Sequence, residues 1–175
     1  MPILSFSTLM PRNDQGIFPS RYQLIPRVLI FIFNNCEVLL LHGKKDKPIW
    51  PGKYNGVGGH LEKGEDAITA ARRELLEESG ISCKDLTFCG NIFIDTGQNP
   101  GILLFVFKGH YQGEKLIRSE EGDLEWIDLD KLSDYPLVED LFQLIPRVYN
   151  WKPGMRYING RYYYNDDDLV TNFDE

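Results

Sequence analysis

Apolar residues in this chain are gathered into short runs that are separated by polar, glycine-containing or proline-containing turns. Runs of this length that are rich in Leu, Ile, Val and Phe predict β-strands. Pro26 places the beginning of the first run at a sheet edge or bulge. Asn34–Asn35 predicts the turn of a hairpin between the first two runs. The predicted strands are 24–33, 37–41, 86–95, 102–111 and 124–127.

Two other segments have the composition or spacing of helices. The stretch before Ser79–Gly80 is filled with Ala, Leu, Arg and Glu, which favour a helix, and Asp66 suits its N-terminus. Residues 137–149 carry apolar side chains at amphipathic spacing, and Pro146 is expected to kink this helix or end it early. Together these elements predict an α/β/α sandwich, in which a mixed sheet has one helix on each side.

The two ends of the chain differ from this pattern. Residues 1–22 contain several prolines and predict an irregular segment. Residues 155–175 predict a C-terminal hairpin and tail, because Asn159–Gly160 lies between tyrosine-rich arms and is a strong turn signal. This hairpin is expected to extend the sheet or to form a dimer contact. No repeat marks a second domain, so residues 1–175 predict a single domain.

The composition agrees with one soluble domain, since 42% of the 175 residues are hydrophobic and 26% are charged. No apolar run is long enough to cross a bilayer, and the first ten residues lack the basic region of a signal peptide. A cytoplasmic location without a membrane partner is therefore expected. The formal net charge of −7 argues against binding of duplex nucleic acid. Cys36, Cys83 and Cys89 have no metal-type spacing and are expected to be reduced.

Three carboxylates crowd one side of the first predicted helix. Glu74 and Glu78 lie one turn apart, and Glu77 follows Glu74 by three residues. Like charges at i,i+4 destabilise a helix by roughly 0.2–0.5 kcal/mol per pair. A bound hard cation such as Mg²⁺ would reverse this penalty. The alternative is a solvated acidic face that is paired with Arg72 and Arg73.

The residues around this helix have a fixed spacing. Gly59 is followed after five residues by Glu65, and after seven more by the run RELLEESGI at residues 73–81. This spacing resembles the signature of the Nudix hydrolases. The resemblance implies a loop-helix-loop that holds a divalent metal, Mg²⁺ with Mn²⁺ as the alternative, for hydrolysis of a nucleoside diphosphate linked to another group. It implies as metal ligands Glu74, Glu77, Glu78 and Gly59, and it implies that Arg73 pairs with Glu65 to orient the helix.

Two short segments precede this signature, Lys44–Lys45 and the run YNGVGG at residues 54–59. They resemble the MutT-like members of the family, which hydrolyse oxidised purine nucleoside triphosphates. The resemblance implies that Asn55 contacts the base and that Lys45 lies near the phosphates, and Glu139–Asp140 is the nearest counterpart of an acidic pair that reads the base. His60 departs from the lysine that is common there. Without the resemblance, these lysines suit a solvated loop and the acidic pair suits a first helical turn.

An acidic loop at residues 113–123 supplies one more candidate. Nudix enzymes often take a further glutamate from this region to bind metal or activate water, which implies Glu121, with Glu120 as the alternative.

The predicted function is Mg²⁺-dependent hydrolysis of a nucleoside triphosphate to a nucleoside monophosphate and pyrophosphate. Oxidised purine nucleotides such as 8-oxo-dGTP are the candidate substrates. One alternative is a Nudix enzyme that acts on ADP-ribose, a dinucleoside polyphosphate or capped RNA. Another is a catalytically silent domain that only binds a nucleotide. The expected partner is a small nucleotide, and a homodimer is left open.

Overall fold

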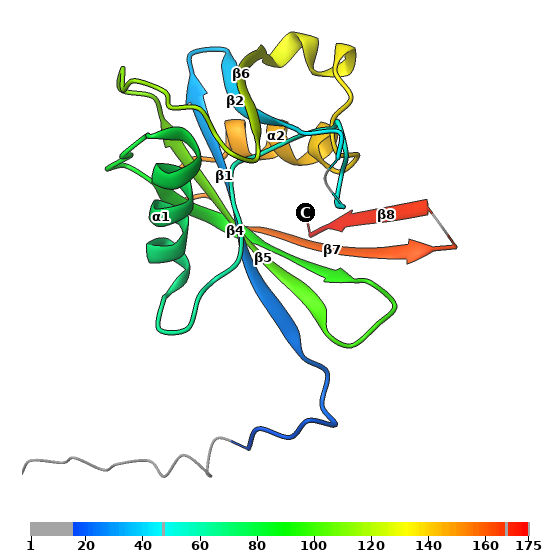
Figure 1. Ribbon diagram of the computed structural model, residues 1–175. Coiled ribbons are helices and arrows are strands. Elements are labelled where there is room, and N and C mark those ends of the chain that lie inside the picture. The colour runs from blue at the N-terminus through cyan, green and yellow to red at the C-terminus, as the bar shows by residue number, and fades with distance from the viewer. Residues whose placement is uncertain (1–15, 47, 167, 175) are drawn as a thin grey trace, which may run out of the picture.

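The computed structural model describes residues 16–46, 48–166 and 168–174, which form one mixed β-sheet flanked by two α-helices (Figure 1). Residues 16–22 contain no helix or strand, in agreement with the predicted irregular segment, whose first part lies outside the described residues. The elements in chain order are β1 (Leu24–Asn34), β2 (Glu37–Gly43), β3 (Tyr54–Asn55), α1 (Ala67–Ser79), β4 (Thr87–Asp95), β5 (Gly101–His110), β6 (Gly122–Asp128), a 3-10 helix (Leu129–Asp134), α2 (Leu141–Asn150), β7 (Ile158–Asn165) and β8 (Asp168–Phe173).

Within the described chain, eight strands form a sheet in the order β3-β2-β1-β5-β4-β7-β8, with β6 paired to β2 beside this path. β1 runs parallel to β5, from Leu24 opposite Gly101 to Phe33 opposite His110. β4 and β7 are also parallel, whereas the other pairs are antiparallel. The sheet is therefore mixed, as the sequence predicted.

β1 is buried on both faces, because its side chains alternate between two hydrophobic cores. Val28, Ile30 and Ile32 pack in the core that contains the buried residues of α1. The residues between them, such as Phe31, pack in the core that contains α2. Strands covered on both faces have continuous apolar sequences, which explains the uninterrupted run in β1. The helices lie on opposite faces of the sheet (Figure 1), so the predicted α/β/α sandwich is confirmed.

Both ends of α1 are fixed by residues of the signature. Asp66 is the N-cap, and its Oδ1 accepts a hydrogen bond of 2.8 Å from the Thr69 backbone N–H. Gly80 ends the helix in the left-handed conformation, with φ 77°, and its N–H donates to the Leu76 carbonyl. The helix therefore starts and stops where the sequence predicts.

The second helix differs from its prediction at both ends. α2 begins at Leu141 rather than Leu137, because residues 137 and 138 pair with the β3 segment instead. The predicted early end at Pro146 is wrong, since α2 continues to Asn150. A proline removes one helical N–H, but Pro146 lies on the exposed face of α2, where water can satisfy the freed carbonyl. Burial of the opposite face keeps the helix intact.

The C-terminal hairpin is present, but its predicted turn is wrong. Asn159 and Gly160 lie inside β7, and the chain turns instead after Asn165, where Asp166 has φ 54°. Gly160 packs closely there, because a Cβ at this position would lie 2.6 Å from Cδ1 of Ile92 and would force that side chain to move. The hairpin extends the sheet through the parallel pairing of β7 with β4.

The structure predicts that α2 is held mainly by its buried face. Ile145→Ala should lower the free energy of unfolding by about 2–5 kcal/mol, because Ile145 is fully buried and the change leaves a cavity. Phe142→Ala, on the same helix, should lower it by less than about 1 kcal/mol, since Phe142 is 43% exposed. Urea denaturation of both variants measures the difference. Equal losses would show that α2 does not pack as described.

Candidate active site

Arg73 on α1 is the centre of the acidic stretch. Its guanidinium donates to both oxygens of Glu65, with 2.8 Å from Nε to Oε1 and 3.0 Å from Nη2 to Oε2. Nη1 donates to Oε1 of Glu74 at 2.9 Å and to Oε2 of Glu77 at 3.2 Å. Nη2 also donates to the His60 carbonyl at 3.0 Å. A planar guanidinium supplies this fork of donors, which an ammonium group cannot. Arg73 thus fastens α1 to the loop that precedes it.

Glu65 is held in place by hydrogen bonds from Arg73 and from the Glu62 backbone N–H. Its hydrogen bonds with Arg73 lower its pKa to about 2, and the Glu62 backbone N–H, which donates to Oε2 at 3.0 Å, contributes to the same shift. The pairing also raises the pKa of Arg73 above its ordinary value. Both groups are therefore ionised at neutral pH.

The three helix carboxylates have different surroundings. The side chain of Glu77 is 60% exposed, whereas that of Glu74 is 13% exposed. Glu78 is buried, and its Oε2 lies 3.3 Å from the Gly58 backbone N–H, which donates to it. Three carboxylates, those of Glu65, Glu74 and Glu77, bond the single guanidinium of Arg73, and Glu78 lies on the same helix, so negative charge is in excess when all are ionised. This excess favours a bound cation.

Gly59 and the Glu74 carboxylate approach closely where the loop meets the helix. A Cβ at Gly59 would lie 2.4 Å from Oε1 of Glu74, so the carboxylate occupies the space that a side chain would take. The Gly59 carbonyl accepts a hydrogen bond of 2.8 Å from the Val28 N–H, which ties the loop to β1. Glu74 and Glu78 consequently both face the glycine loop.

This set of oxygen donors fits a hard divalent cation. Carboxylates and a backbone carbonyl suit Mg²⁺ or Mn²⁺, which prefer oxygen ligands. Among the described residues, no three acidic, histidine or cysteine side chains converge on one cation position, and Arg73 holds Glu74 and Glu77. The donors are suitable in kind and lie beside one loop.

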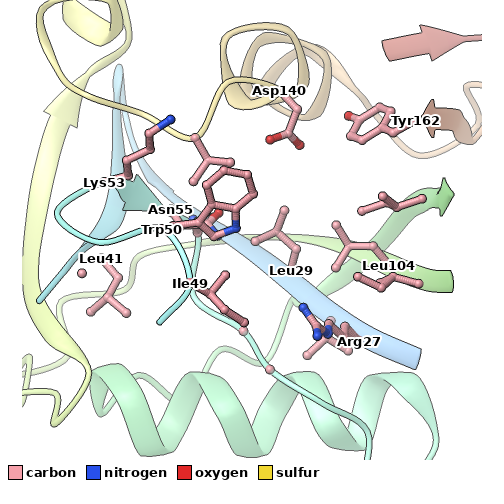
Figure 2. Close-up of a pocket in the computed structure, with 18 of the residues that line it drawn as sticks. Arg27, Leu29, Leu41, Ile49, Trp50, Lys53, Asn55, Leu104, Asp140 and Tyr162 are labelled. Carbon is pink, nitrogen blue, oxygen red and sulfur yellow. Dashed lines mark hydrogen bonds between the residues drawn. The ribbon is translucent and has the colours of Figure 1, made fainter. Parts of the chain in front are cut away.

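A cavity of about 460 Å³ opens next to this loop (Figure 2). Its polar side chains come from distant parts of the chain, and Asp140 and the Tyr162 hydroxyl point toward one another (Figure 2). Residues at the start of the signature are part of its lining, so a ligand in it would approach the carboxylates. The lining includes apolar Leu29, Ile94, Ile102, Leu104, Val138 and Leu169, polar Asn55, Asp140 and Tyr162, and, toward the signature, Gly58, Gly59, His60 and Glu121.

Asp140 is the buried acidic group of this cavity, with 8% exposure. Burial raises its pKa to about 6, and the nearby charge of Glu139 acts in the same direction. Burial and the charge of Asp140 together raise the pKa of Tyr162. At neutral pH, Tyr162 is therefore a hydrogen-bond donor and Asp140 is mostly an acceptor.

Comparison with known families identifies the family of the chain. The model of the NUDIX domain matches residues 23–148, which include the cavity residues up to Asp140 and the whole acidic stretch. The chain belongs to the Nudix family. The predicted family is thus confirmed.

Relatives of the Nudix chain agree with the predicted subgroup and with hydrolase chemistry. An oxidized purine nucleoside triphosphate hydrolase from Danio rerio is 39% identical over 106 residues, which are 59% of this chain and 66% of that protein. A protein of the same name from Mus musculus is 28% identical over 83% of this chain and 90% of its own length. The crystal structure of a MutT protein from Bacillus halodurans has a TM-score of 0.73 at 25% identity and covers 86% of this chain and 98% of that one.

The structure brings most of the predicted site residues of this Nudix chain into two adjoining groups. The carboxylates of the signature surround Arg73 and the glycine loop, as described above. Asn55, Asp140 and Glu121 line the cavity, and Glu120 is not among its lining residues. The Asn55 Oδ1 accepts a hydrogen bond of 2.8 Å from the Gly56 N–H, which leaves its amide group available to a ligand.

Two predicted residues lie away from the cavity. Lys45 and Glu139 are not among the lining residues. The Glu139 side chain is 63% exposed and pairs with Nζ of Lys53 at 3.0 Å. Both residues are close in sequence to residues that line the cavity. Their roles in substrate binding stay predictions.

Four cavity residues were missed in the sequence. Arg27 and Lys53 supply cations, and Trp50, with φ 52°, lines the cavity with its ring centroid 5.4 Å from Nζ of Lys53. Arg27 interrupts an apolar run, which is a signal that could have identified it, and its Nε donates to Nε2 of His60 at 3.1 Å. Tyr162 has no such signal, because only the sheet pairing brings β7 to the cavity.

The close approach at Gly59 yields a test of the metal site. Gly59→Ala should displace the Glu74 carboxylate and lower kcat by roughly 10- to 100-fold, the usual effect of disturbing the support of a metal ligand. Activity as a function of Mg²⁺ concentration, with circular dichroism to verify folding, measures this effect. An alanine variant with the wild-type Mg²⁺ response would contradict the proposed contact.

Proposed function

We propose that this protein is a divalent-metal-dependent hydrolase that cleaves purine nucleoside triphosphates to a nucleoside monophosphate and pyrophosphate. Oxidised purine nucleotides such as 8-oxo-dGTP are the proposed substrate class. The observation that carries this proposal is that one cavity is lined both by Asn55 and Asp140 and by Gly59 of the signature. The names of the two relatives described above support the same substrate class.

The triphosphate end is formed by the acidic stretch. We assign Glu74, Glu77 and Glu78, with the Gly59 carbonyl, to hold Mg²⁺ or Mn²⁺, and Arg73 and Glu65 to keep α1 in position. The bound ion supplies charge neutralisation for the phosphates and a lowered pKa for an attacking water. Glu121 lines the same cavity and is assigned as the carboxylate that binds metal or accepts the proton of that water.

Cations of the chain can neutralise the remaining phosphate charge. Arg27 and Lys53 line the cavity and are better placed for this role than Lys45, which stays a prediction from the resemblance. Burial lowers the pKa of Arg27, but an arginine remains charged at neutral pH. An acidic protein that binds a polyanion needs such local positive charge.

The part of the cavity that we assign to the base contains hydrogen-bond donors and acceptors among apolar side chains. The Asn55 carboxamide and the Asp140 carboxyl group can recognise the edge of a purine, whose ring would lie between the aliphatic side chains of the cavity. Glu139 would act there through Lys53 rather than directly, because its carboxylate pairs with that lysine.

The alternatives are a different Nudix substrate, such as ADP-ribose, a dinucleoside polyphosphate or capped RNA, and a silent nucleotide-binding domain. The complete set of signature carboxylates supports an enzyme over a silent domain. A panel containing 8-oxo-dGTP, ordinary dNTPs, ADP-ribose and diadenosine polyphosphates, assayed for Mg²⁺-dependent phosphate or pyrophosphate release, distinguishes them. Preferential hydrolysis of another compound class would replace the proposed substrate.

The domain organisation, the cellular location and the partners of the protein are also proposals. No helix in the described part of the chain has the length and hydropathy of a membrane span. We retain a single domain, a cytoplasmic location and a partner that is a small nucleotide rather than duplex nucleic acid. A homodimer is left to measurement in solution.

Loss of the helix carboxylates tests the reaction. Glu77→Gln and Glu78→Gln should each lower kcat by several orders of magnitude with the fold retained, because each change removes a charge that the bound ion needs. Glu62→Gln, in the exposed loop before α1, serves as the control and should retain turnover. Rates near that of the wild type in either helix variant would contradict the assignment.

The raised pKa of Asp140 tests the base end. Its folded pKa of about 6 exceeds the ordinary value of 3.8, so the native state holds this proton more tightly and loses stability as pH rises between these values. Asp140→Asn should remove that loss and gain about 1–3 kcal/mol relative to the wild type from pH 4 to pH 7. Urea denaturation across this range measures the gain, and a pH-independent difference would contradict the raised pKa of Asp140.

A further inference from the structure

Tyr162 has a buried hydroxyl with no hydrogen-bond partner. The residue is 1% exposed, and its hydroxyl is the one buried polar side-chain atom in the described chain for which no partner is present. A buried polar group without a partner is destabilising, because it has lost its hydrogen bonds to water. Phenylalanine would fill the same space without that penalty, so folding alone does not account for the hydroxyl.

Hydrophobic packing and the sheet hold the tyrosine ring in place without help from the hydroxyl. Tyr162 lies opposite Ile94 in the parallel pairing of β7 with β4, and Ile94 also lines the cavity. Its ring meets Phe173 of β8 edge to face, with centroids 5.7 Å apart. The oxygen atom is therefore carried to a fixed position at the cavity wall.

The hydroxyl faces a complementary group that also lines the cavity. Asp140 and Tyr162 point toward one another (Figure 2), and the charge of Asp140 contributes to the raised pKa of Tyr162. A protonated phenol donates and an ionised carboxylate accepts, so a ligand edge with an acceptor beside an N–H can engage both. A guanine-type base, with a carbonyl oxygen beside a ring N–H, has such an edge.

We propose that Tyr162 is a specificity-determining residue that donates a hydrogen bond to the base of the substrate, next to the contact made by Asp140. This inference rests on the proposed function, because it takes the base of a purine nucleoside triphosphate as the ligand. Tyr162 lies C-terminal to residues 23–148, so the contact comes from the β7–β8 hairpin rather than from the matched domain. The hairpin thereby completes the base end of the cavity.

Tyr162→Phe tests the proposal because it removes the oxygen atom and keeps the ring. KM for 8-oxo-dGTP should rise about tenfold, the factor expected for one lost hydrogen bond, with kcat nearly unchanged because the base is remote from the reaction. The free energy of unfolding should stay the same or rise, since no protein hydrogen bond is lost. A tyrosine with only a structural role would show the opposite pattern, with lower stability and an unchanged KM.

Tyr163→Phe is the matched control. Tyr163 is the next residue of β7, so the substitution removes the same hydroxyl group. Tyr163 is not among the residues that line the cavity. Its KM should stay within about twofold of the wild-type value, because the substitution removes no contact with the substrate. Inorganic tripolyphosphate, which has no base, is the second control and should bind equally well to wild type and Tyr162→Phe when used as a competitive inhibitor.

The outcomes separate this inference from the proposed function. Hydrolysis of 8-oxo-dGTP by the wild type with an unchanged KM in Tyr162→Phe would overturn the inference alone. A loss of stability in Tyr162→Phe, or an equal loss of tripolyphosphate binding, would also overturn it. Absence of Mg²⁺-dependent hydrolysis of any purine nucleoside triphosphate by the wild type would instead overturn the proposed function.

Discussion

The two-sided burial of β1 is the constraint on which the rest of the molecule depends. Because its alternate side chains fill the cores under α1 and α2, the strand cannot shift without disrupting both layers. The glycine loop is tied to it by hydrogen bonds from Ile30 to Val57 at 2.7 Å and from Val28 to Gly59 at 2.8 Å. A Cβ at Gly58 would lie 2.1 Å from the Val28 carbonyl oxygen, so only glycine allows this approach. β1 therefore fixes the acidic site relative to the cavity.

The charge balance of the acidic site is set by one arginine, which holds three carboxylates in position. Arg73 satisfies Glu65 completely and shares its remaining donors between Glu74 and Glu77, which leaves Glu78 facing the glycine loop. The arginine orders the carboxylates but does not neutralise them. The carboxylates are thus held in position, but their negative charge is not balanced. A divalent ion with its phosphate ligand would balance this charge.

The cavity joins parts of the chain that are far apart in sequence. Arg27 comes from β1, Lys53 from the loop before β3, Asp140 from the start of α2 and Tyr162 from β7. Asp140 and Tyr162 are both held in an apolar setting that raises their pKa values. Such a setting makes each hydrogen bond with a ligand more selective, because an unmatched ligand would leave a buried polar group without a partner.

Errors of the sequence interpretation have identifiable physical causes. Pro146 is a helix breaker by propensity, yet burial of the opposite face of α2 outweighs one lost hydrogen bond. Asn159–Gly160 is a turn signal by propensity, yet both residues lie inside β7, where they pair with Asn91 and Ile92 of β4. In both places a tertiary contact overrides a local preference, and no local pattern contains that information.

The sequence by itself determined the family, the strand and helix order, the caps of α1 and the acidic residues around Arg73. These features depend on local periodicity and on spacing within one loop and one helix, and both can be read along the chain. Only the tertiary structure decided that Lys53 pairs with Glu139 and that Tyr162 faces Asp140. Those contacts join strands and loops through sheet pairing and core packing, whose partners are chosen by the whole fold and not by neighbouring residues.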